Sequence, residues 1–277
     1  LPIDYRRFTA DFKAKENSKA MWIIKPSASS CGKGIKVLNS TSKLPKNKKN
    51  HLISRYISKP HLINGHKYDM RVYVLVVSYD PLVVYMYKDG LVRFSTEKYS
   101  LKQKNLNKQW VHLTNYSINK KADGYVKNQN KNSDDEGDNE TNDDTSKWSY
   151  NQLLNKLYNM GLDYEEVDEE IKDVIIKTII SVEPYIVHQM NAHTRHKNVW
   201  FELYGFDVIL DSKLKPWILE VNVGPSLSSS SPFDKRLKTK LICDTLTLIG
   251  VRAFDKNLNK NKSSTLYSKP PKLRHKA

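Results

Sequence analysis

Two neighbouring β-strands constrain the fold of this 277-residue sequence more than any other feature. Glu202–Asp211 and Lys215–Asn222 alternate with a period of two and are rich in Val, Ile, Leu and aromatic residues, as strands are. The polar residues between them, which end at Pro216, indicate a turn. The two runs therefore predict a β-hairpin that belongs to a rigid sheet.

This hairpin brings oxygen-bearing side chains together. Residues two apart in a strand share a face, so Glu220 and Asn222 point the same way. If the turn is centred between Lys213 and Leu214, Asp207 lies opposite Glu220. A carboxylate pair among apolar residues is costly unless a cation or hydrogen bonds compensate it, and Mg²⁺ bound with ATP phosphates is one such compensation. The pattern leaves a second interpretation open, a strand end whose carboxylates face solvent or pair with Lys.

The charge of the chain favours anionic partners. The formal net charge is +16, although Asp134–Asp144 contains seven acidic residues and no Lys or Arg, so the rest of the chain is more basic still. Such a field attracts nucleic acid, an anionic membrane surface or an acidic polypeptide. Charge alone does not choose among these three classes.

Length, hydropathy and cysteine content exclude several classes of protein. A chain of this length forms one large domain or two modest ones. The sequence has no apolar run near the roughly 18 residues of a membrane-spanning helix, so we expect no membrane partner. Cys31 and Cys243 are too few for a disulfide framework, which fits a reducing compartment.

A glycine-containing loop between two short strands is another candidate ligand site. After a helix expected over Asp4–Lys15, strands are predicted at Met21–Pro26 and Ile35–Leu38. The backbone N–H groups of the small residues in Ser27–Gly34 could lie over phosphates, with Lys25 at the base of the loop. A turn without a ligand is the alternative, because glycine-rich hairpins are common.

Three charged residues share one face of the longest predicted strand. His66–Val77, which follows a shorter strand at His51–Ile57, contains Lys67, Asp69 and Arg71 at a spacing of two. A strongly apolar continuation follows them. Either a polar site or a solvated strand end explains this pattern.

The middle of the chain contains further strands and a polar insertion. Strands are predicted at Leu82–Tyr87 and Leu91–Phe94, joined by a tight turn at Lys88–Gly90. Trp110–Ser117 is short, apolar and aromatic. Residues 120–146 are rich in Asn, Asp and Lys, which predicts a disordered surface insertion.

The rest of the chain adds helices to these strands. Trp148–Met160 and the segment that begins at Asp163 carry apolar residues at helical spacing, and a third helix is predicted over Asp234–Val251. We interpret the apolar stripe of the second helix as core packing. Residues 256–277 predict a disordered basic tail. Together, the elements predict an α+β fold.

Seven short motifs follow one another in the order found in one known protein family. They are Trp22–Pro26, Gly32–Ile35, Arg55–Pro60, Lys67–Arg71, His112–Ser117, Gly205–Asp207 and Leu219–Asn222. The sequence resembles the tubulin tyrosine ligase-like family, within the ATP-grasp class, over roughly residues 1–252. Pro225–Pro232, which follows the last motif, looks like the polyglutamylase branch of that family.

The resemblance implies an ATP-grasp fold, in which antiparallel sheets with flanking helices hold ATP between two subdomains. Residues 1–90 would form the central part, and residues 91–252 the C-terminal part with the insertion at 120–146. Residues 253–277 would form the basic tail. The N-terminal subdomain of the class would precede Leu1 and is expected to be missing.

The resemblance also implies a role for each residue that matches a family motif. The residues implied to contact ATP are Lys25, Cys31, Gly32, Ser54, Arg55, Tyr56, Ile57, Lys67, Tyr68, Asp69, Thr114 and Asn115. Those implied to bind Mg²⁺ are Asp207, Glu220 and Asn222, in agreement with the hairpin. Those implied to hold the incoming amino acid are Arg93, Tyr116, Ser117, Lys147 and Lys238. The implied catalytic residues are Lys25, Lys67, Arg93 and Glu220.

Two positions depart from the family pattern. Cys31 stands where relatives often carry Arg, which puts one cationic phosphate contact in doubt. Ser54 stands where relatives usually carry Gln, and its side chain is too short to read adenine in the same way. Neither departure removes a catalytic group.

The function implied by the resemblance is an ATP- and Mg²⁺-dependent ligase, a tubulin polyglutamylase. It would add free L-glutamate to glutamate side chains of acidic tubulin tails through an acyl phosphate, and nucleic acid is not expected as a partner. The implied location is the cytoplasm and cytoskeleton, with the cilium, flagellum or basal body as more specific candidates. The alternatives are a basic module that binds microtubules or nucleic acid and has a decayed nucleotide site, and the same fold ligating glycine or tyrosine. Arg93 with Lys147 and Lys238 favours an acidic amino acid, because a side-chain carboxylate is best bound by cations.

Overall fold

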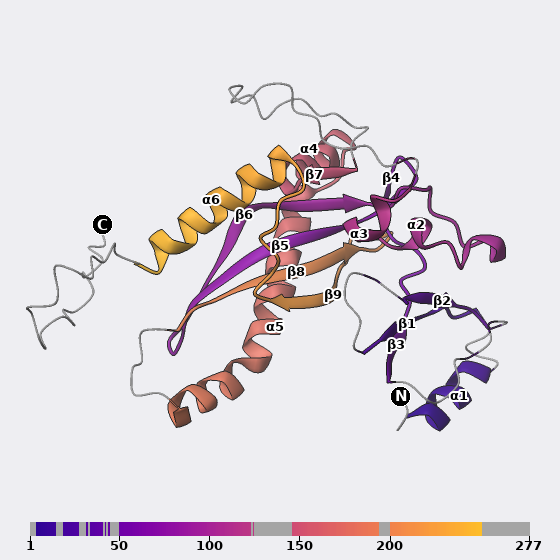
Figure 1. The fold of residues 1–277 in the computed structure, drawn as a ribbon, viewed down its shortest axis with the longest axis horizontal. Helices are drawn as coiled ribbons and strands as arrows, with labels where there is room; N and C mark the ends of the chain where they lie inside the picture. Colours follow the sequence, from indigo (N-terminus) through magenta and orange to yellow (C-terminus); the bar gives the residue numbers. More distant parts are fainter. Residues whose placement is uncertain are drawn as a thin grey trace, which may run out of the picture.

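The computed structural model describes residues 4–14, 19–27, 34–40, 50–122, 146–193 and 200–250, together with residues 32, 42, 44 and 124. Its elements form a small and a large antiparallel sheet with helices packed against them (Figure 1). The α+β expectation is therefore confirmed. The predicted disordered insertion falls mostly outside the described residues, as do Cys31 and the basic tail.

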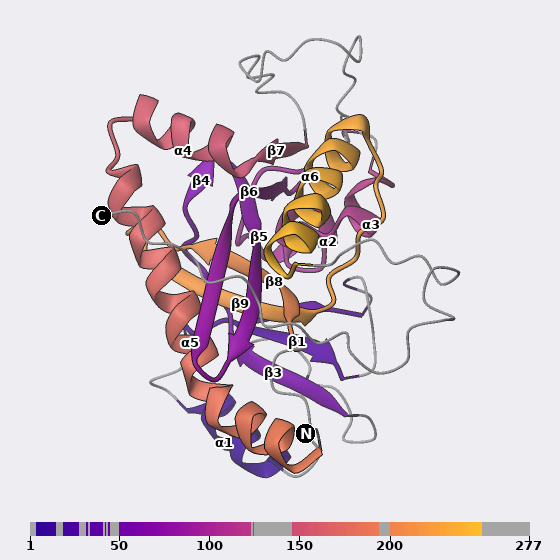
Figure 2. The same ribbon diagram turned by 90° about the vertical axis from the view of Figure 1, so that its left-hand side faces the viewer.

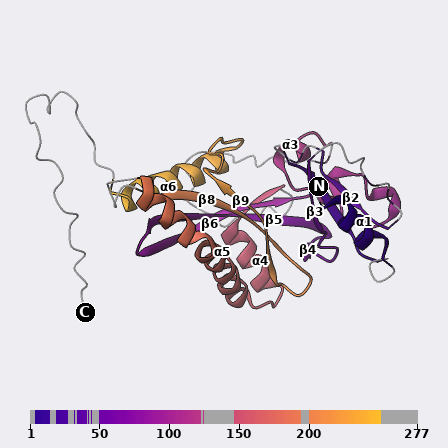
Figure 3. The ribbon, with the colours of Figure 1, turned by 90° about the horizontal axis from the view of Figure 1, so that it is seen from below.

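The small sheet is formed by the N-terminal part of the chain. Its strands lie in the order β2 (Lys36–Leu38), β1 (Trp22–Pro26) and β3 (His51–Arg55). The helix α1 (Tyr5–Lys13) packs Phe12 against Trp22 and Ile24 on one face. Because side chains alternate along β1, Ile23 and Lys25 lie on the opposite face. Figure 3 shows the small sheet and α1 beyond one end of the large sheet.

The large sheet supplies most of the structure. Its main order is β7 (Lys147–Ser149), β6 (Leu82–Phe94), β5 (His66–Tyr79), β8 (Glu202–Leu210) and β9 (Pro216–Val223), and β4 (Leu62–Ile63) pairs with the start of β5. The Asn64–Gly65 turn between β4 and β5 has positive φ at both residues, 52° and 81°. Asn-Gly is a strong hairpin signal that the sequence analysis did not use.

One face of the large sheet forms the main hydrophobic core. Tyr68, Met70 and Val72 of β5 point to this face and pack with α4 (Tyr150–Asn159) and α5 (Tyr164–His193). The predicted apolar stripe of the second helix is confirmed as core packing at Val167, Ile171, Ile175 and Ile179 of α5, which are all buried, whereas Val182 further along the helix is exposed. Figure 2 shows the strands between α4 and α5 on one side and α6 (Pro232–Leu248) on the other.

The opposite face of the sheet is polar at one end and apolar under α6. Lys67, Asp69, Arg71 and Tyr73 of β5 all point to this face, because they are two residues apart. Leu237 and Leu241 of α6 cover Tyr73 and Leu91. Three short helices, η2 (Gln103–Asn105), α2 (Gln109–His112) and α3 (Tyr116–Asn119), follow β6.

The predicted tight turn at Lys88–Gly90 is wrong. The strand β6 runs through these residues, and an irregularity in its pairing lies opposite Tyr73: Val72 pairs with Gly90, but Val74 pairs with Met86. The extra residues are absorbed by a bulge instead of a chain reversal.

Two residues of this bulge explain why it forms. The carboxylate of Asp89 accepts hydrogen bonds from the N–H groups of Gly90, Tyr150 and Asn151, which ties the bulge to the start of α4. A Cβ atom at Gly90 would lie 2.5 Å from the carbonyl oxygen of Arg71, so glycine permits the close approach of the two strands.

Among the helices in the described part of the chain, none is both long and apolar enough to cross a lipid bilayer.

Candidate functional site

The hairpin of β8 and β9 places the predicted oxygen-bearing residues on one face. Asp207 lies opposite Glu220 and Gly205 lies opposite Asn222, so the predicted pairing is confirmed. The predicted centre of the turn is wrong, because the pairs next to the turn are centred on Lys213 and not between Lys213 and Leu214. A bulge at Leu219 lies next to the pair. The three side chains therefore share the face that also carries Lys67 and the other charged residues of β5.

The turn of this hairpin is organised by a carboxylate. Asp211 accepts hydrogen bonds from the N–H groups of Lys213 and Lys215, at 2.8 and 3.2 Å, and from Nε1 of Trp217 at 3.0 Å. Burial opposes ionisation of Asp211, but these hydrogen bonds outweigh it and lower its pKa. The turn is thereby fixed in one geometry, which supports the register of the strands.

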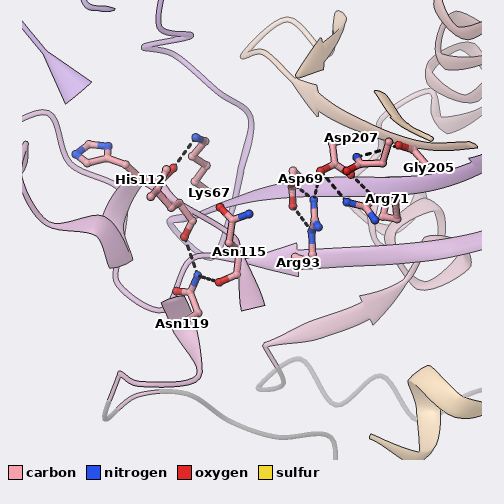
Figure 4. A network of polar contacts seen from close by, with 11 residues as sticks. Lys67, Asp69, Arg71, Arg93, His112, Asn115, Asn119, Gly205 and Asp207 are labelled. Atoms are coloured by element: carbon pink, nitrogen blue, oxygen red, sulfur yellow. Dashed lines mark hydrogen bonds and ion pairs between the residues drawn. The ribbon is translucent and has the colours of Figure 1, made fainter. Parts of the chain in front are cut away.

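Asp207 belongs to a buried network of alternating charges. Nε and Nη2 of Arg71 donate to Oδ1 and Oδ2 of Asp207, and Nη2 lies 3.0 Å from Oδ2. Arg93 bridges two carboxylates, with Nη2 at 2.9 Å from Oδ2 of Asp207 and Nε at 2.9 Å from Oδ1 of Asp69 (Figure 4). All four side chains are between 4% and 13% exposed, so the interpretation of the charged β5 residues as a solvated strand end is wrong. For the hairpin that interpretation holds in part, since Glu220 is exposed.

The network determines the ionisation of Asp207. Burial by itself raises the pKa of this carboxyl, but the charges and hydrogen bonds of Arg93 and Arg71 outweigh it and lower the pKa. The compensation that the sequence analysis assigned to Mg²⁺ is thus supplied by two arginines in this structure. Each Asp207 oxygen already accepts at least one hydrogen bond.

Glu220 is the carboxylate that lacks such compensation. Although Glu220 is exposed, partial desolvation of its carboxyl group, the negative charge of Asp207 and a hydrogen bond to Asp207 raise its pKa, while the charges of Lys25 and Arg71 oppose this effect. A divalent cation between Asp207 and Glu220 would remove the repulsion, so the pair fits a metal ion.

The third member of the set is an amide. Nδ2 of Asn222 donates to the carbonyl of Gly205 at 3.1 Å, so only its side-chain oxygen could bind a cation. In the described part of the chain no three His, Cys, Asp or Glu side chains form a metal-binding group. Two acids and an amide suit Mg²⁺ if phosphate oxygens complete its shell.

Two lysines approach the same end of the sheet. Lys67 is 7% exposed, and its Nζ donates to the carbonyl of His112 at 2.7 Å. Burial lowers the pKa of Lys67 to about 8, against the opposing effect of Asp69 and with a contribution from the charge of Lys25. Lys25 is close enough to Lys67 and to Glu220 for its charge to act on each of them.

A pocket of about 320 Å³ is lined in part by His112, the residue whose carbonyl accepts from Lys67. Its apolar lining comes from Ile35 and Val37, just before β2 and within it, and from Leu106 and Leu113 after β6. Its polar lining includes Lys36, Asn107, Lys108 and Gln109. His112, also in the wall, contacts the hydroxyl of Tyr56 through Nδ1 at 3.0 Å and the carbonyl of Asn105 through Nε2 at 3.2 Å. The carbonyl accepts, so Nε2 carries the hydrogen and Nδ1 accepts from Tyr56.

Gly32 packs directly on the motif of α3. A Cβ atom at Gly32, where φ is +75°, would lie 2.7 Å from Oδ1 of Asn115. The Asn119 amide donates to the Asn115 and Leu113 carbonyls at 3.2 and 2.7 Å and holds the turn between them. Thr114 is buried in the same turn. The structure therefore brings Gly32, Thr114 and Asn115 together.

The side chains of Arg55 and Tyr68 point away from the candidate site, so only their backbone could reach a nucleotide. The guanidinium of Arg55 lies 5.0 Å from the ring centroid of Trp22, on the α1 face of the small sheet. Tyr68 is in the main core, and its hydroxyl is 2.8 Å from Nδ1 of His61. Ser54 lies opposite Ile23, on the face of Lys25, and Ile57 is half-buried.

A second polar cluster lies under the N-terminal end of α6. Lys147 pairs with Arg93 across β7 and β6, and its Nζ is 2.8 Å from both Oδ2 of Asp234 and Oγ of Ser230. It also lies 4.3 Å from the ring centroid of Tyr116. Nζ of Lys238 donates to the carbonyl of Ser228. The residues predicted to hold the amino acid therefore gather here, with Ser117 in the adjacent α3.

Sequence reasoning missed two residues of this region as site residues. Arg71 is the third member of the charged triplet on β5, and its period-two spacing from Lys67 was the available signal. Asp234 is an acid in the first turn of a helix, which normally indicates only capping.

Nearly the whole sequence of this chain is similar to that of known proteins. A model of the Tubulin-tyrosine ligase family matches residues 1–259. The chain belongs to the tubulin-tyrosine ligase family. It is 45% identical over 236 residues to a tubulin monoglutamylase of Mus musculus, a match that covers 85% of this chain and 19% of the relative.

Two further members of the tubulin-tyrosine ligase family are similar over more of the chain. A tubulin polyglutamylase of Homo sapiens is 42% identical over 250 residues, 90% of this chain and 19% of the relative. A probable beta-tubulin polyglutamylase of Tetrahymena thermophila is 39% identical over 262 residues, 93% of this chain and 21% of the relative. The chain therefore spans about a fifth of the length of these curated relatives.

Proposed function

We propose that this chain is the catalytic part of an ATP- and Mg²⁺-dependent ligase that adds glutamate to glutamate side chains of tubulin tails. The observation that carries the proposal is the juxtaposition of Asp207 and Glu220 beside the two lysines Lys25 and Lys67. The names of the family members, mono- and polyglutamylases of tubulin, support the same acceptor.

The phosphate end of ATP would lie between the two sheets. Lys25 and Lys67 would place positive charge on its oxygens, and the backbone of Gly32 with the turn of Thr114 and Asn115 would enclose them. Asp207, Glu220 and Asn222 would hold Mg²⁺, which when bound screens the phosphate charge. The pocket beside His112 has both apolar and polar walls, which would suit the base. The backbone of Ser54–Ile57 would contact the base from the small sheet.

The reaction would proceed in two steps. The γ-phosphate passes to a side-chain carboxylate of the acceptor, which gives an acyl phosphate and ADP. The α-amine of free glutamate then attacks the acyl carbon, phosphate leaves, the amine loses a proton and an isopeptide bond forms. Arg93, whose Nε and Nη2 already donate to Asp69 and Asp207, would attract a carboxylate of the incoming glutamate by its charge. Lys147 and Lys238 would add the charge that favours an acidic amino acid.

The partners follow from the charge of the chain and from its relatives. A net charge of +16 attracts the acidic tails of tubulin electrostatically. Because tubulin tails account for this charge, no nucleic-acid partner is required. We place the activity in the cytoplasm, on the cytoskeleton, with ciliary or flagellar microtubules and basal bodies as candidate sites. The basic binding module is less well supported, because a decayed site would have no use for Glu220 beside Asp207.

The experiment that tests this function measures transfer of isotope-labelled glutamate to tubulin in the presence of ATP and Mg²⁺. The chain is expected to label tubulin, and Glu220→Gln is expected to abolish labelling without unfolding the protein. Labelling with glycine or tyrosine in place of glutamate would assign a different amino acid to the same fold. Full activity of Glu220→Gln would refute the metal assignment.

A further inference from the structure

Two buried polar atoms have no hydrogen-bond partner within the described residues. They are the hydroxyl of Tyr73, a residue that is 0% exposed, and Oδ1 of Asp234, a residue that is 2% exposed. A buried polar atom without a partner is costly and is rare in folded proteins. Two of them in one region indicate that a polar ligand or water completes their hydrogen bonds.

Both atoms belong to the same region between the sheet and α6. Tyr73 lies under α6 and packs with Leu237 and Leu241. Burial raises the pKa of Tyr73 to about 12, and its hydroxyl is close enough to Arg71, Arg93, Asp234 and Asp207 for their charges to act on it. Lys238 is also close enough to Asp234, Lys147, Arg71 and Arg93 for their charges to act on it. The two orphan atoms thus lie among the cations already assigned to the amino acid.

The two oxygens of Asp234 are used differently. Oδ2 accepts from Lys147 at 2.8 Å and from N and Oγ of Ser230 at 3.1 and 2.7 Å. These contacts outweigh burial and lower the pKa of Asp234, so the group is a carboxylate at neutral pH. They also complete its structural role at the start of α6. Oδ1 is not needed for that role.

The charges of the incoming amino acid match what the cluster offers. Glutamate carries two carboxylates and one ammonium group, so its site needs cations and one acceptor for the ammonium. Asp69 and Asp207 are engaged by Arg71 and Arg93. Among the described carboxylates of this cluster, Asp234 has an oxygen free to accept from an ammonium group.

We propose that Oδ1 of Asp234 binds the α-ammonium group of the incoming amino acid and that the hydroxyl of Tyr73 donates to one of its carboxylates. Neither residue belongs to the motifs that the sequence analysis assigned to this substrate. The inference rests on the proposed glutamate-ligating function and adds the group that distinguishes an amino acid from a simple dicarboxylate.

The first test is Tyr73→Phe, which removes only a hydroxyl without a protein partner. Binding of labelled L-glutamate is measured by equilibrium dialysis with ADP and Mg²⁺ present. The dissociation constant is expected to rise about tenfold, because a hydrogen bond to a charged group is lost. The melting temperature without glutamate is expected to stay the same or rise. Unchanged glutamate affinity would remove Tyr73 from the site.

The second test compares L-glutamate with glutarate, which has both carboxylates but no ammonium group. Asp234→Asn is expected to weaken glutamate binding about tenfold or more, while competition by glutarate stays the same or improves. Ser231→Ala is the structural control, because Ser231 caps α6 and accepts from the N–H of Asp234. It is expected to lower the melting temperature without changing the ratio of the two affinities.

The outcomes separate the inference from the function on which it rests. Equal loss of glutamate and glutarate binding in Asp234→Asn would mean that Asp234 only holds Lys147 and α6, and would overturn the inference. Labelled transfer to tubulin by the unmodified chain is measured in parallel and decides the function. A chain that transfers glutamate but shows no change in the ratio refutes the ammonium site alone.

Discussion

Asp207 faces Glu220 because β9 contains one extra residue, Leu219. Near the turn, Val208 pairs with Ile218, whereas beyond the bulge Asp207 pairs with Glu220. A regular ladder would place Leu219 opposite Asp207, and Glu220 would then point to the core face beneath α5. The bulge therefore moves one carboxylate from the core face to the site face.

The first prediction concerns the metal pair. A non-hydrolysable ATP analogue with Mg²⁺ at 100 times its dissociation constant should stabilise the chain by about 2.7 kcal/mol and raise its melting temperature by several degrees. Glu220→Gln is expected to lose most of the Mg²⁺-dependent part of this rise in a thermal scan. The control is Glu169→Gln, since Glu169 lies in an exposed ion pair with Lys172 on α5. A full Mg²⁺-dependent rise in Glu220→Gln would contradict the assignment.

The second prediction concerns the stability of the charge network. Arg93→Ala leaves Asp69 and Asp207 buried with fewer cations and is expected to lower the free energy of unfolding by about 3–5 kcal/mol in urea. Adding Asp69→Asn should cost less than the sum of the two single changes, by about 0.5–3 kcal/mol. The exposed pair of Lys177 and Asp173 is the control, and Lys177→Ala should cost under about 1 kcal/mol. Additive effects at the buried pair would argue against the network.

The third prediction is a pH dependence of nucleotide affinity. The pKa of Lys67 is lowered to about 8 by burial, with Lys25 adding to the shift and Asp69 opposing it, and Tyr56 and His112 are its other polar neighbours. Only the protonated form of Lys67 attracts phosphate, so ATP affinity should fall as pH rises from 7 to 9. A lysine with the ordinary pKa of 10.5 would cause this fall only at higher pH. Calorimetry should also detect proton uptake on ATP binding near pH 8–9. Lys67→Arg keeps its charge and should bind with a flat profile, and a flat profile in the unmodified chain would exclude this role.

The fourth prediction concerns acid stability. Burial and the charge of Lys67 lower the pKa of His112 to about 4, against the hydrogen bond to Asn105, and the aromatic rings of Tyr56 and Tyr99 pack on it. The unfolded chain therefore takes up this proton first, near pH 6.5, and stability should fall as pH decreases from 6.5 towards 4. His112→Gln retains a donor and an acceptor, so its melting temperature should fall less over this range. Parallel curves for the two proteins would show that His112 does not contribute.

Some parts of this site could be predicted from the sequence because they depend on local spacing. Period-two alternation placed Lys67, Asp69 and Arg71 on one face and joined Glu220 to Asn222. The same reasoning failed at Lys88–Gly90, where the Lys-Asp-Gly sequence predicted a tight turn. This sequence also suits a bulge, in which Asp89 accepts a hydrogen bond from the start of α4, a helix distant in sequence.

The sequence by itself determined the α+β class, the family and the residues that face the site, because alternation and motif order are properties of neighbouring positions. The tertiary structure decided which charges compensate one another. Arg71 and Arg93 neutralise Asp207, and Asp234 reaches Lys147 from a helix 87 positions further along the chain. Such pairings depend on which strands are adjacent and on where α6 crosses the sheet, so the energy of burying each charge is set only when the fold is complete.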